Sequence, residues 1–413
     1  MGKIRNKIEN ILHMPIWRRN IYVLWVVCFV VGMGFSEVVP FLSFYIDDLG
    51  DFSKSQLNFY SGIVFAATYV MTALTSPMWG KLADRTGRKP MILRTSLGTC
   101  IAFLCMGLSR NVWQLLFFRG LQGIFGGTIS NATALVAIET PEEEAGHALG
   151  ILTTGTTAGN LLGPMLGGFL ASLMSYRNVF FVTVGLMFTA FLLCVFFVKE
   201  TRLSVANKKL AKQSFVQVFK NFAHPRLILG LFITTMIIQV SNTSINPFLS
   251  LYVREIVGKG FHLTLLAGIV SAIPGVATIL VAPKFGEMGD KIGSHKMLTF
   301  GFALAIIVII PMSFVRNIWQ LIILRFILGI SDATMMPAIN TLLAKNTPHT
   351  ATSRTFAYNQ SFMSIGGVMG PAVGTFVATW FADYRYVFLT TAGFVVFNMV
   401  LFLFNSKVLW GRK

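Results

Sequence analysis

The chain has 413 residues, of which 54% are hydrophobic and only 12% are charged. A soluble domain of this length carries about twice that charged fraction, so the composition excludes a soluble enzyme. In a soluble chain the net charge of +18 would suggest binding to nucleic acid. Here the distribution of positive residues between the two sides of a membrane explains it. All four cysteines lie inside apolar runs, which leaves no disulfide framework or zinc-ligand spacing. We therefore expect no nucleic-acid partner and no metal.

Apolar runs of about 20 residues, separated by short polar connections, fill most of the chain. A helix of about 20 residues crosses the ~30 Å hydrocarbon layer of a bilayer, whereas strands of outer-membrane barrels alternate over about 10 residues. The sequence therefore predicts an all-α integral membrane protein with twelve transmembrane helices. The expected spans are residues 21–45, 58–79, 91–109, 112–137, 147–172, 178–198, 228–252, 264–285, 296–315, 318–343, 355–380 and 386–405.

Positive charge is distributed unevenly between the connections. With a cytoplasmic N-terminus, 25 of the 34 lysines and arginines fall on the cytoplasmic side and seven on the outer side. Positive residues are retained inside, so both termini are predicted to be cytoplasmic. The longest polar stretch, residues 199–226, is basic and separates six spans from six. We expect an N-terminal bundle at 1–198, a cytoplasmic linker at 199–226 and a C-terminal bundle at 227–413.

The two halves of the chain repeat each other. Residues 40–45, Pro-Phe-Leu-Ser-Phe-Tyr, recur as Pro-Phe-Leu-Ser-Leu-Tyr at 247–252, an offset of 207. Arg119 matches Arg325 at an offset of 206. Because six spans are an even number, both copies enter the membrane from the same side, and the repeat is parallel. Such a repeat predicts a substrate site between the halves near mid-membrane and transport by alternating access.

Three sequence motifs resemble those of the major facilitator superfamily. They are Gly80-Lys-Leu-Ala-Asp-Arg-Thr-Gly-Arg-Lys89 between spans 2 and 3, Arg119-Gly-Leu-Gln-Gly123 in span 4, and a glycine series from Gly155 to Gly168 in span 5. The chain looks most similar to the twelve-span drug:proton antiporters, and among them to bacterial multidrug efflux proteins. The resemblance implies a monomeric transporter of the bacterial cytoplasmic membrane, surrounded by membrane lipid. It would expel amphipathic or cationic small molecules in exchange for protons, using the proton gradient and no cofactor.

The loop motif between spans 2 and 3 places an acid beside a helix end, followed by three basic groups. An acid at a positive helix end and bases that reach carboxylates can latch one conformation of two bundles. Glu139, at the cytoplasmic end of span 4, is a candidate partner for Arg88. Alternatively the loop is only a positive topological signal. The predicted gate residues are Gly80, Asp84, Arg85, Gly87, Arg88, Lys89 and Glu139, with Asp290 in a weaker second copy.

Small residues recur at every fourth position of span 5, which places them on one helix face. Such faces let helices approach closely in lipid, and a proline can bend the helix. Packing alone and sealing of the cavity against ion leak both explain the pattern; the family resemblance favours antiport. The residues of this motif are Gly155, Gly159, Gly163, Pro164, Gly167 and Gly168, with Gly370 and Pro371 at the matching place in span 11.

Four ionisable residues lie inside predicted spans: Glu37, Arg119, Arg325 and Asp332. A charge facing lipid there costs ~2.5 kcal/mol or more, so each is expected to face the bundle interior or water. Asp332 follows Arg325 by two helical turns, about 10 Å along the same face, too far for a simple direct pair. Asp332 and Glu37 are the candidate proton carriers, and Arg119 is expected to orient a carrier or hold a helix interface. The alternative for each is a satisfied buried ion pair or a group that reaches the membrane surface.

Polar residues also punctuate spans 4, 5, 7 and 11. Interhelical hydrogen bonds are their common fate, but some are expected to line a cavity that 38 phenylalanines and 19 methionines can make apolar and adaptable. The candidate cavity residues are Asn131, Asn160, Gln239, Asn242, Tyr358, Asn359 and Gln360, with Phe35, Phe65 and Tyr69 on spans that border the cavity in the resembled family.

Other functions remain open on sequence grounds. The first alternative is a proton-coupled transporter of a sugar or small metabolite with the same fold, against which the glycine and proline series of span 5 argues. A channel or a membrane-embedded enzyme is a second, but the chain has no nucleophile constellation, and the repeat favours alternating access over a fixed pore. ATP-driven export is unsupported because the phosphate-binding pattern G-x-x-x-x-G-K-[ST] is absent.

Overall fold

The computed structural model describes residues 14–201, 224–258, 260, 262–347 and 352–406, and within these every regular element is a helix. The predicted linker therefore lies largely outside the described residues. The first helices are α2 (Ile16–Glu37), α3 (Leu42–Asp47), α4 (Lys54–Thr86), α5 (Arg88–Gly107), α6 (Val112–Ile124), α7 (Thr128–Glu139), α8 (Glu142–Leu173) and α9 (Tyr176–Phe197). They are followed by α11 (Pro225–Val257), α12 (Leu263–Ile292), α13 (Ser294–Met312), α14 (Ile318–Asn346), α15 (Thr352–Phe381) and α16 (Arg385–Asn405).

The predicted all-helical membrane fold is confirmed. In the described part of the chain, 11 helical segments are long and apolar enough to cross a membrane. The predicted span at 147–172 is not among them, although it forms the 32-residue helix α8. Its glycines and threonines and Asn160 lower its mean hydropathy below that of the others.

Two predicted spans are interrupted. The span expected at 21–45 ends as α2 at Glu37 and resumes as α3, because Pro40 in the intervening turn has no N–H to continue the ladder. The span expected at 112–137 divides into α6 and α7 at Gly126 and Gly127. The first of these helices ends at Ile124. Gly127, the N-cap of α7, has a φ of 107°, a conformation that favours glycine.

The helices group into two compact units: one of Met1–Val38 with Val70–Ala206, the other of Val39–Tyr69 with Asn207–Lys413. The second unit thus contains α3 and the first part of α4, which belong to the first sequence repeat. The two six-span bundles predicted from the sequence remain a prediction about which parts move together.

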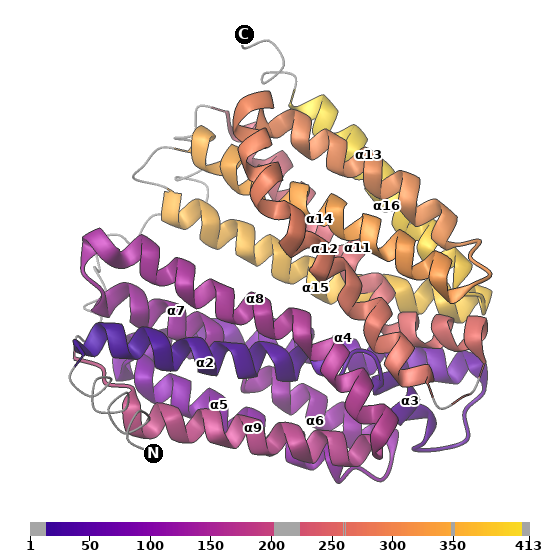
Figure 1. The fold of residues 1–413 in the computed structure, drawn as a ribbon, viewed down its shortest axis with the longest axis horizontal. Helices are drawn as coiled ribbons and strands as arrows, with labels where there is room; N and C mark the ends of the chain where they lie inside the picture. Colours follow the sequence, from indigo (N-terminus) through magenta and orange to yellow (C-terminus); the bar gives the residue numbers. More distant parts are fainter. Residues whose placement is uncertain (1–13, 202–223, 259, 261, 348–351, 407–413) are drawn as a thin grey trace. The chain divides into compact units, whose positions relative to one another are not determined.

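In the first unit, α2 runs along α8 and α5 runs along α9 (Figure 1). The predicted glycine face of α8 lies against the backbone of α2. A Cβ atom on Gly159 would lie 2.2 Å from the carbonyl oxygen of Phe29, and one on Gly167 would lie 2.0 Å from that of Glu37. Only hydrogen fits at these positions, so the glycines set the distance between the two helices.

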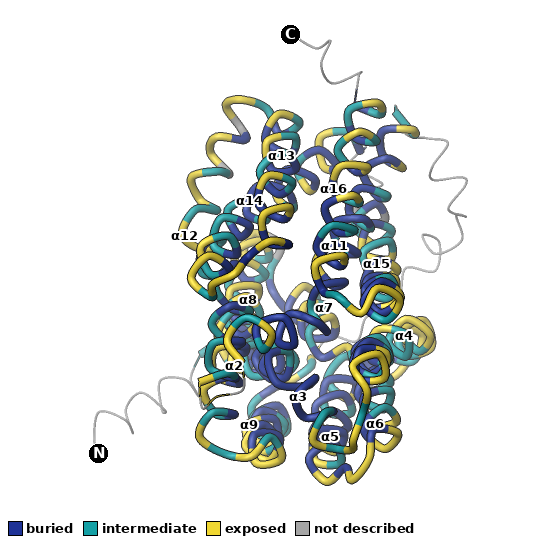
Figure 2. Tube along the Cα trace, turned by 90° about the vertical axis from the view of Figure 1, so that its right-hand side faces the viewer, coloured by how far each residue is buried: buried dark blue, intermediate teal, exposed yellow. Residues whose placement is uncertain are grey.

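The second unit repeats this pairing with α11 and α15, while α14 packs between α12 and α13, and α16 contacts α11 and α13. A Cβ atom on Gly370 would lie 2.0 Å from Oγ1 of Thr243, and one on Gly374 would lie 2.2 Å from the carbonyl oxygen of Ser244. The short helix α3 is buried along most of its length, whereas α12 carries many exposed residues (Figure 2). The glycines therefore allow close packing of equivalent helix pairs in the two repeats, α2 with α8 and α11 with α15.

Replacing Gly159 by valine should destabilise the protein by about 1–3 kcal/mol, since the added carbons overlap the α2 backbone. The measurement is thermal unfolding of the purified protein in detergent. The matched control is Gly150→Val on the same helix, where a Cβ meets nothing within 4 Å and the change should stay within about 0.5 kcal/mol. Equal effects of the two variants would contradict the close packing.

Candidate functional site

A narrow cavity in the second unit contains the candidate proton carrier Asp332. The cavity measures about 20 Å³ and is lined from α11, α13, α14 and α16, with Arg325 and Asn242 among its residues. That volume suits about one water molecule. Oδ1 of Asp332 is buried and has no hydrogen-bond partner within the described residues. An ionised oxygen without a donor is costly in such surroundings. The role of Asp332 as a proton carrier remains a prediction.

Arg325 lies two turns before Asp332 on α14 and lines the same cavity. Its Nε donates a hydrogen bond of 3.2 Å to the carbonyl oxygen of Val270 on α12. No ion pair within 4 Å joins Arg325 to Asp332 in the described part of the chain. The guanidinium of Arg325 therefore influences the Asp332 carboxylate electrostatically, across the cavity, and forms no direct ion pair with it. A backbone carbonyl of the neighbouring helix α12 holds the guanidinium in place.

Glu37 is enclosed in the first unit, at the end of α2, with 1% of its surface exposed. Thr183 on α9 donates a hydrogen bond to Oε1 of its carboxylate. At the repeat-equivalent positions, Ser244 and Thr391 have hydroxyl oxygens 3.0 Å apart. The pair of Glu37 and Thr183 in the first repeat thus corresponds to a pair of hydroxyl groups in the second repeat. Only the first repeat therefore has a carboxyl group that can bind or release a proton at this position.

The two candidate arginines have different partners. Nη1 of Arg119 donates a 2.7 Å hydrogen bond to Oε1 of Gln122, one turn further along α6, and both side chains are buried. This fixes the guanidinium within the first unit, whereas Asp332 lies in the second. The role of Arg119 in orienting a proton carrier remains a prediction.

In the loop motif, Nη2 of Arg88 pairs with Oδ1 of Asp84 at 2.6 Å. The carboxylate of Glu200 accepts the backbone N–H groups of Arg88 at 2.7 Å and Lys89 at 2.9 Å. These N–H groups open α5 and have no partner within the helix. Gly87 has a φ of 97°, and a Cβ there would lie 2.7 Å from Oε2 of Glu200. Gly87 is thus required both by its backbone conformation and by the approach of Glu200.

Lys199 and Thr201, on either side of Glu200, form hydrogen bonds with the ends of two further helices. Glu139, at the end of α7, accepts hydrogen bonds from the backbone N–H and the hydroxyl of Thr201. Asn20 on α2 bonds both the N–H and the carbonyl of Lys199. Residues 199–201 therefore connect the ends of α2, α5 and α7. The partnership of Glu139 with Arg88 stays a prediction, and the side chain of Asp290 lies outside the described residues.

The candidate cavity residues are spread over both units. Phe35, Asn131 and Asn160 belong to the first unit, and the other seven belong to the second. Asn131, Asn359 and Phe65 are buried; Phe35, Gln239 and Tyr358 are half-buried; Asn160, Asn242, Gln360 and Tyr69 are exposed. Of these ten, Asn242 lines the cavity of Asp332.

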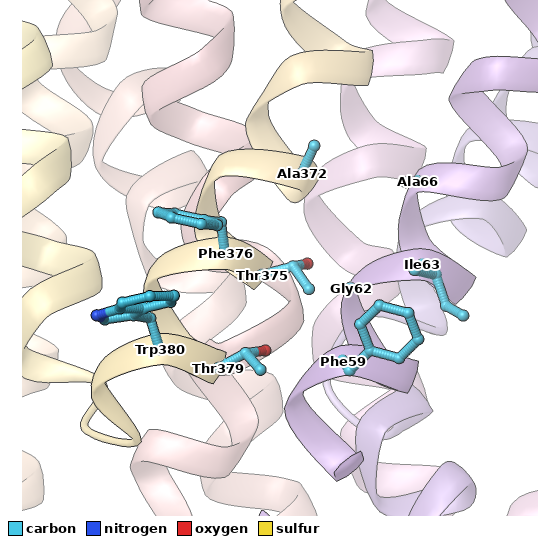
Figure 3. Close-up of a pocket in the computed structure, with 9 residues that line it drawn as sticks. All are labelled: Phe59, Gly62, Ile63, Ala66, Ala372, Thr375, Phe376, Thr379 and Trp380. Atoms are coloured by element: carbon cyan, nitrogen blue, oxygen red, sulfur yellow. The ribbon is translucent and has the colours of Figure 1, made fainter. Parts of the chain in front are cut away.

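A larger groove of about 570 Å³ lies between α4 and α15 in the second unit. Figure 3 shows Phe59 on α4 and the rings of Phe376 and Trp380 on α15 around it. Gly62 and Thr375 both line the groove, and the two helices touch there, because a Cβ on Gly62 would overlap Thr375. The volume falls in the range of drug-sized pockets, roughly 300–1,000 Å³. Sequence reasoning missed this groove because helix periodicity does not reveal which helices of the two repeats meet.

The carboxylate of Glu200 should contribute stability as a cap of α5. Replacing it by alanine is expected to cost about 0.5–2 kcal/mol, the usual range for losing a helix cap, because two N–H groups lose their acceptor. Thermal unfolding in detergent measures the effect. Glu143→Ala, at an exposed position on α8, is the control, and an equal loss in both variants would contradict the capping role.

Comparison with known proteins agrees with the architecture. The model of the Major Facilitator Superfamily matches residues 24–260 and 231–409. The chain is 46% identical over 384 residues to Multidrug resistance protein MdtG of Salmonella heidelberg (strain SL476) and, to the same extent, to that of Salmonella schwarzengrund (strain CVM19633). Each of these matches covers 93% of this chain and 94% of the relative.

Solved structures share the fold at low sequence identity. A bacterial homologue of the human lysosomal transporter Spinster, inward-facing and occupied, superposes with a TM-score of 0.78 at 15% identity, covering 95% of this chain and 97% of the other. The nucleoside transporter NupG gives a TM-score of 0.76 at 14% identity, covering 94% and 100%. With its family match, its near full-length relatives and its duplicated helical architecture, the chain belongs to the major facilitator superfamily.

Proposed function

We propose that this protein exports amphipathic, often cationic compounds in exchange for protons by alternating access. The observation that carries the proposal is the 46% identity to Multidrug resistance protein MdtG over 93% of the chain. The adaptable supply of phenylalanine and methionine supports the substrate class. The proton gradient drives the exchange, and no cofactor takes part.

Asp332 is the main proton carrier in this proposal. Oδ1 of its carboxyl is buried without a hydrogen-bond partner among the described residues, and Arg325 lines the same cavity. A carboxyl whose surroundings change between two conformations can take up a proton in one and release it in the other. A proton that binds one conformation more tightly shifts the equilibrium between inward-open and outward-open states. Glu37 supplies a second titratable group in the first unit.

The membrane orientation belongs to the same proposal. Both termini and the basic linker lie in the cytoplasm, as the distribution of lysine and arginine favours, and the membrane is the bacterial cytoplasmic membrane. The loop motif from Gly80 to Lys89 then lies at the cytoplasmic face, where Asp84 and Arg88 take part in closing the inner side. The working unit is the monomer, which holds both repeats in one chain.

Ethidium transport in everted membrane vesicles tests the coupling. Imposing a pH gradient that is acidic inside the vesicles should accelerate ethidium uptake, and an ionophore that collapses the gradient should stop it. Vesicles without the protein provide the background. Uptake that ignores the imposed gradient would refute proton coupling, and absence of transport for several amphipathic cations would favour the sugar or small-metabolite alternative.

Replacing Asp332 by asparagine should reduce gradient-driven ethidium uptake to background, because an amide cannot carry the proton. Asp51→Asn, which removes an exposed acid from a loop, is the control and should retain transport. Membrane insertion and thermal unfolding are measured for both, so that loss of fold is distinguished from loss of coupling. Unaltered coupling in the Asp332→Asn variant would remove this residue from the mechanism.

A further inference from the structure

Two ion pairs join the end of α3 and the start of α4 to the end of α11. Nη1 of Arg254 lies 2.5 Å from Oδ2 of Asp47, and Nζ of Lys54 lies 2.6 Å from Oε1 of Glu255. We call these four residues the outer lock, since the predicted topology places them on the outer side of the membrane. They line one cavity within the second unit, together with Tyr384.

The lock connects equivalent positions of the two repeats. The offset of 207 that superposes the Pro-Phe-Leu-Ser segments also superposes Asp47 on Arg254. Equivalent positions that touch meet at the symmetry axis of the repeat, as in a two-fold dimer interface. Two identical charges would repel each other there. The chain instead carries opposite charges at positions 47 and 254, so the contact is attractive only because the repeats have diverged.

Buried hydrogen bonds beneath the ion pairs make this contact specific. Ser43 donates to the carbonyl oxygen of Pro247 at 2.7 Å, and Nδ2 of Asn58 donates to that of Ala378 at 3.0 Å. The hydroxyl of Tyr384 donates to Oδ1 of Asn58 at 2.8 Å. Each bond joins residues 39–69 to the second repeat. The segment is therefore seated in a defined position.

The ion pairs themselves are suited to release. Their side chains retain 23–46% of their exposed surface, and ion pairs this accessible to water are weak and screened by salt. Lys54 also lies 5.0 Å from the centre of the Tyr384 ring, which orients its ammonium toward Glu255. The ion pairs thus add only a small amount to the free energy of opening, whereas the buried hydrogen bonds set the placement of the segment.

We propose that Asp47, Lys54, Arg254 and Glu255 form a releasable lock that sets how often the transporter opens to the outside. The inference rests on the proposed alternating access, in which residues 39–69 must part from α11 to expose the cavity outward. Weakening the lock increases the population of the outward-open state. It does so without touching substrate or the proton carriers.

Cysteine labelling tests the lock. Leu57, which lines the same cavity with 3% of its surface exposed, is replaced by cysteine and labelled in whole cells with a membrane-impermeant maleimide. Protein retaining leucine at this position gives the background from the four native cysteines. Asp47→Arg and Arg254→Asp should each raise the labelling rate roughly two- to fivefold, the factor by which an ion pair of this kind shifts an equilibrium. The double exchange should restore the original rate.

Matched variants separate the lock from simple loss of structure. Lys54→Gln and Glu255→Gln test the second pair with smaller changes, and Asp51→Asn is the control that should leave labelling unchanged. Raising the salt concentration should speed labelling of the protein with an intact lock, and it should do so less in a neutral Asp47→Asn, Arg254→Gln double variant, in which only the Lys54–Glu255 pair remains to be screened. Single variants that label at the original rate, or a double exchange that labels as fast as the single ones, would overturn the proposal.

Labelling requires neither substrate nor a gradient, so its outcome is separable from that of transport. If the lock variants behave as expected and ethidium uptake ignores a pH gradient, the lock stands and proton coupling fails. If uptake follows the gradient and the double exchange fails to restore labelling, coupling stands and the lock is refuted.

Discussion

Backbone contact at glycine is the constraint on which the rest of this structure depends. Between helices in lipid the hydrophobic effect gives little drive for association, and close packing supplies it instead. The glycine face of α8 therefore lies directly on α2, and the glycines of α15 lie on α11. The same contact positions the chemistry, because the carbonyl oxygen of Glu37 lies where Gly167 has no side chain. A shift between these helices would move a buried carboxylate.

On this shared scaffold the two repeats hold different polar groups. The first encloses Glu37 with Thr183, whereas hydroxyls alone occupy the equivalent place in the second. The second instead keeps Asp332 in a cavity with Arg325. Neither of these two acids has an acidic counterpart in the other repeat, because Ser244 corresponds to Glu37 and Gly126 corresponds to Asp332. The pair of acids therefore arises from divergence within a symmetric frame.

Much of this arrangement could be predicted from the sequence, because apolar length, fourfold glycine spacing and repeat offset are local or regular signals. The contacts of Glu200 with Arg88 and Lys89 could not, since they join residues more than 100 positions apart. A glutamate two residues after the end of a predicted span at Val198 was the available clue. The break after Glu37 was equally hidden. The same Pro-Phe-Leu-Ser sequence interrupts a helix at Pro40 but continues inside α11 at Pro247, so packing decides the outcome.

The joint between α6 and α7 has an evolutionary consequence. By the offset that relates Arg119 to Arg325, Gly126 at this joint corresponds to Asp332 in the uninterrupted helix α14. A single ancestral half could not have held both residues at one position. A homodimer of the first half would have the break between two helices in both copies and no acid at this position. A homodimer of the second half would have an aspartate at this position in both copies and no break. Any mechanism that needs both features therefore requires two different halves, and this chain supplies both of them in one molecule.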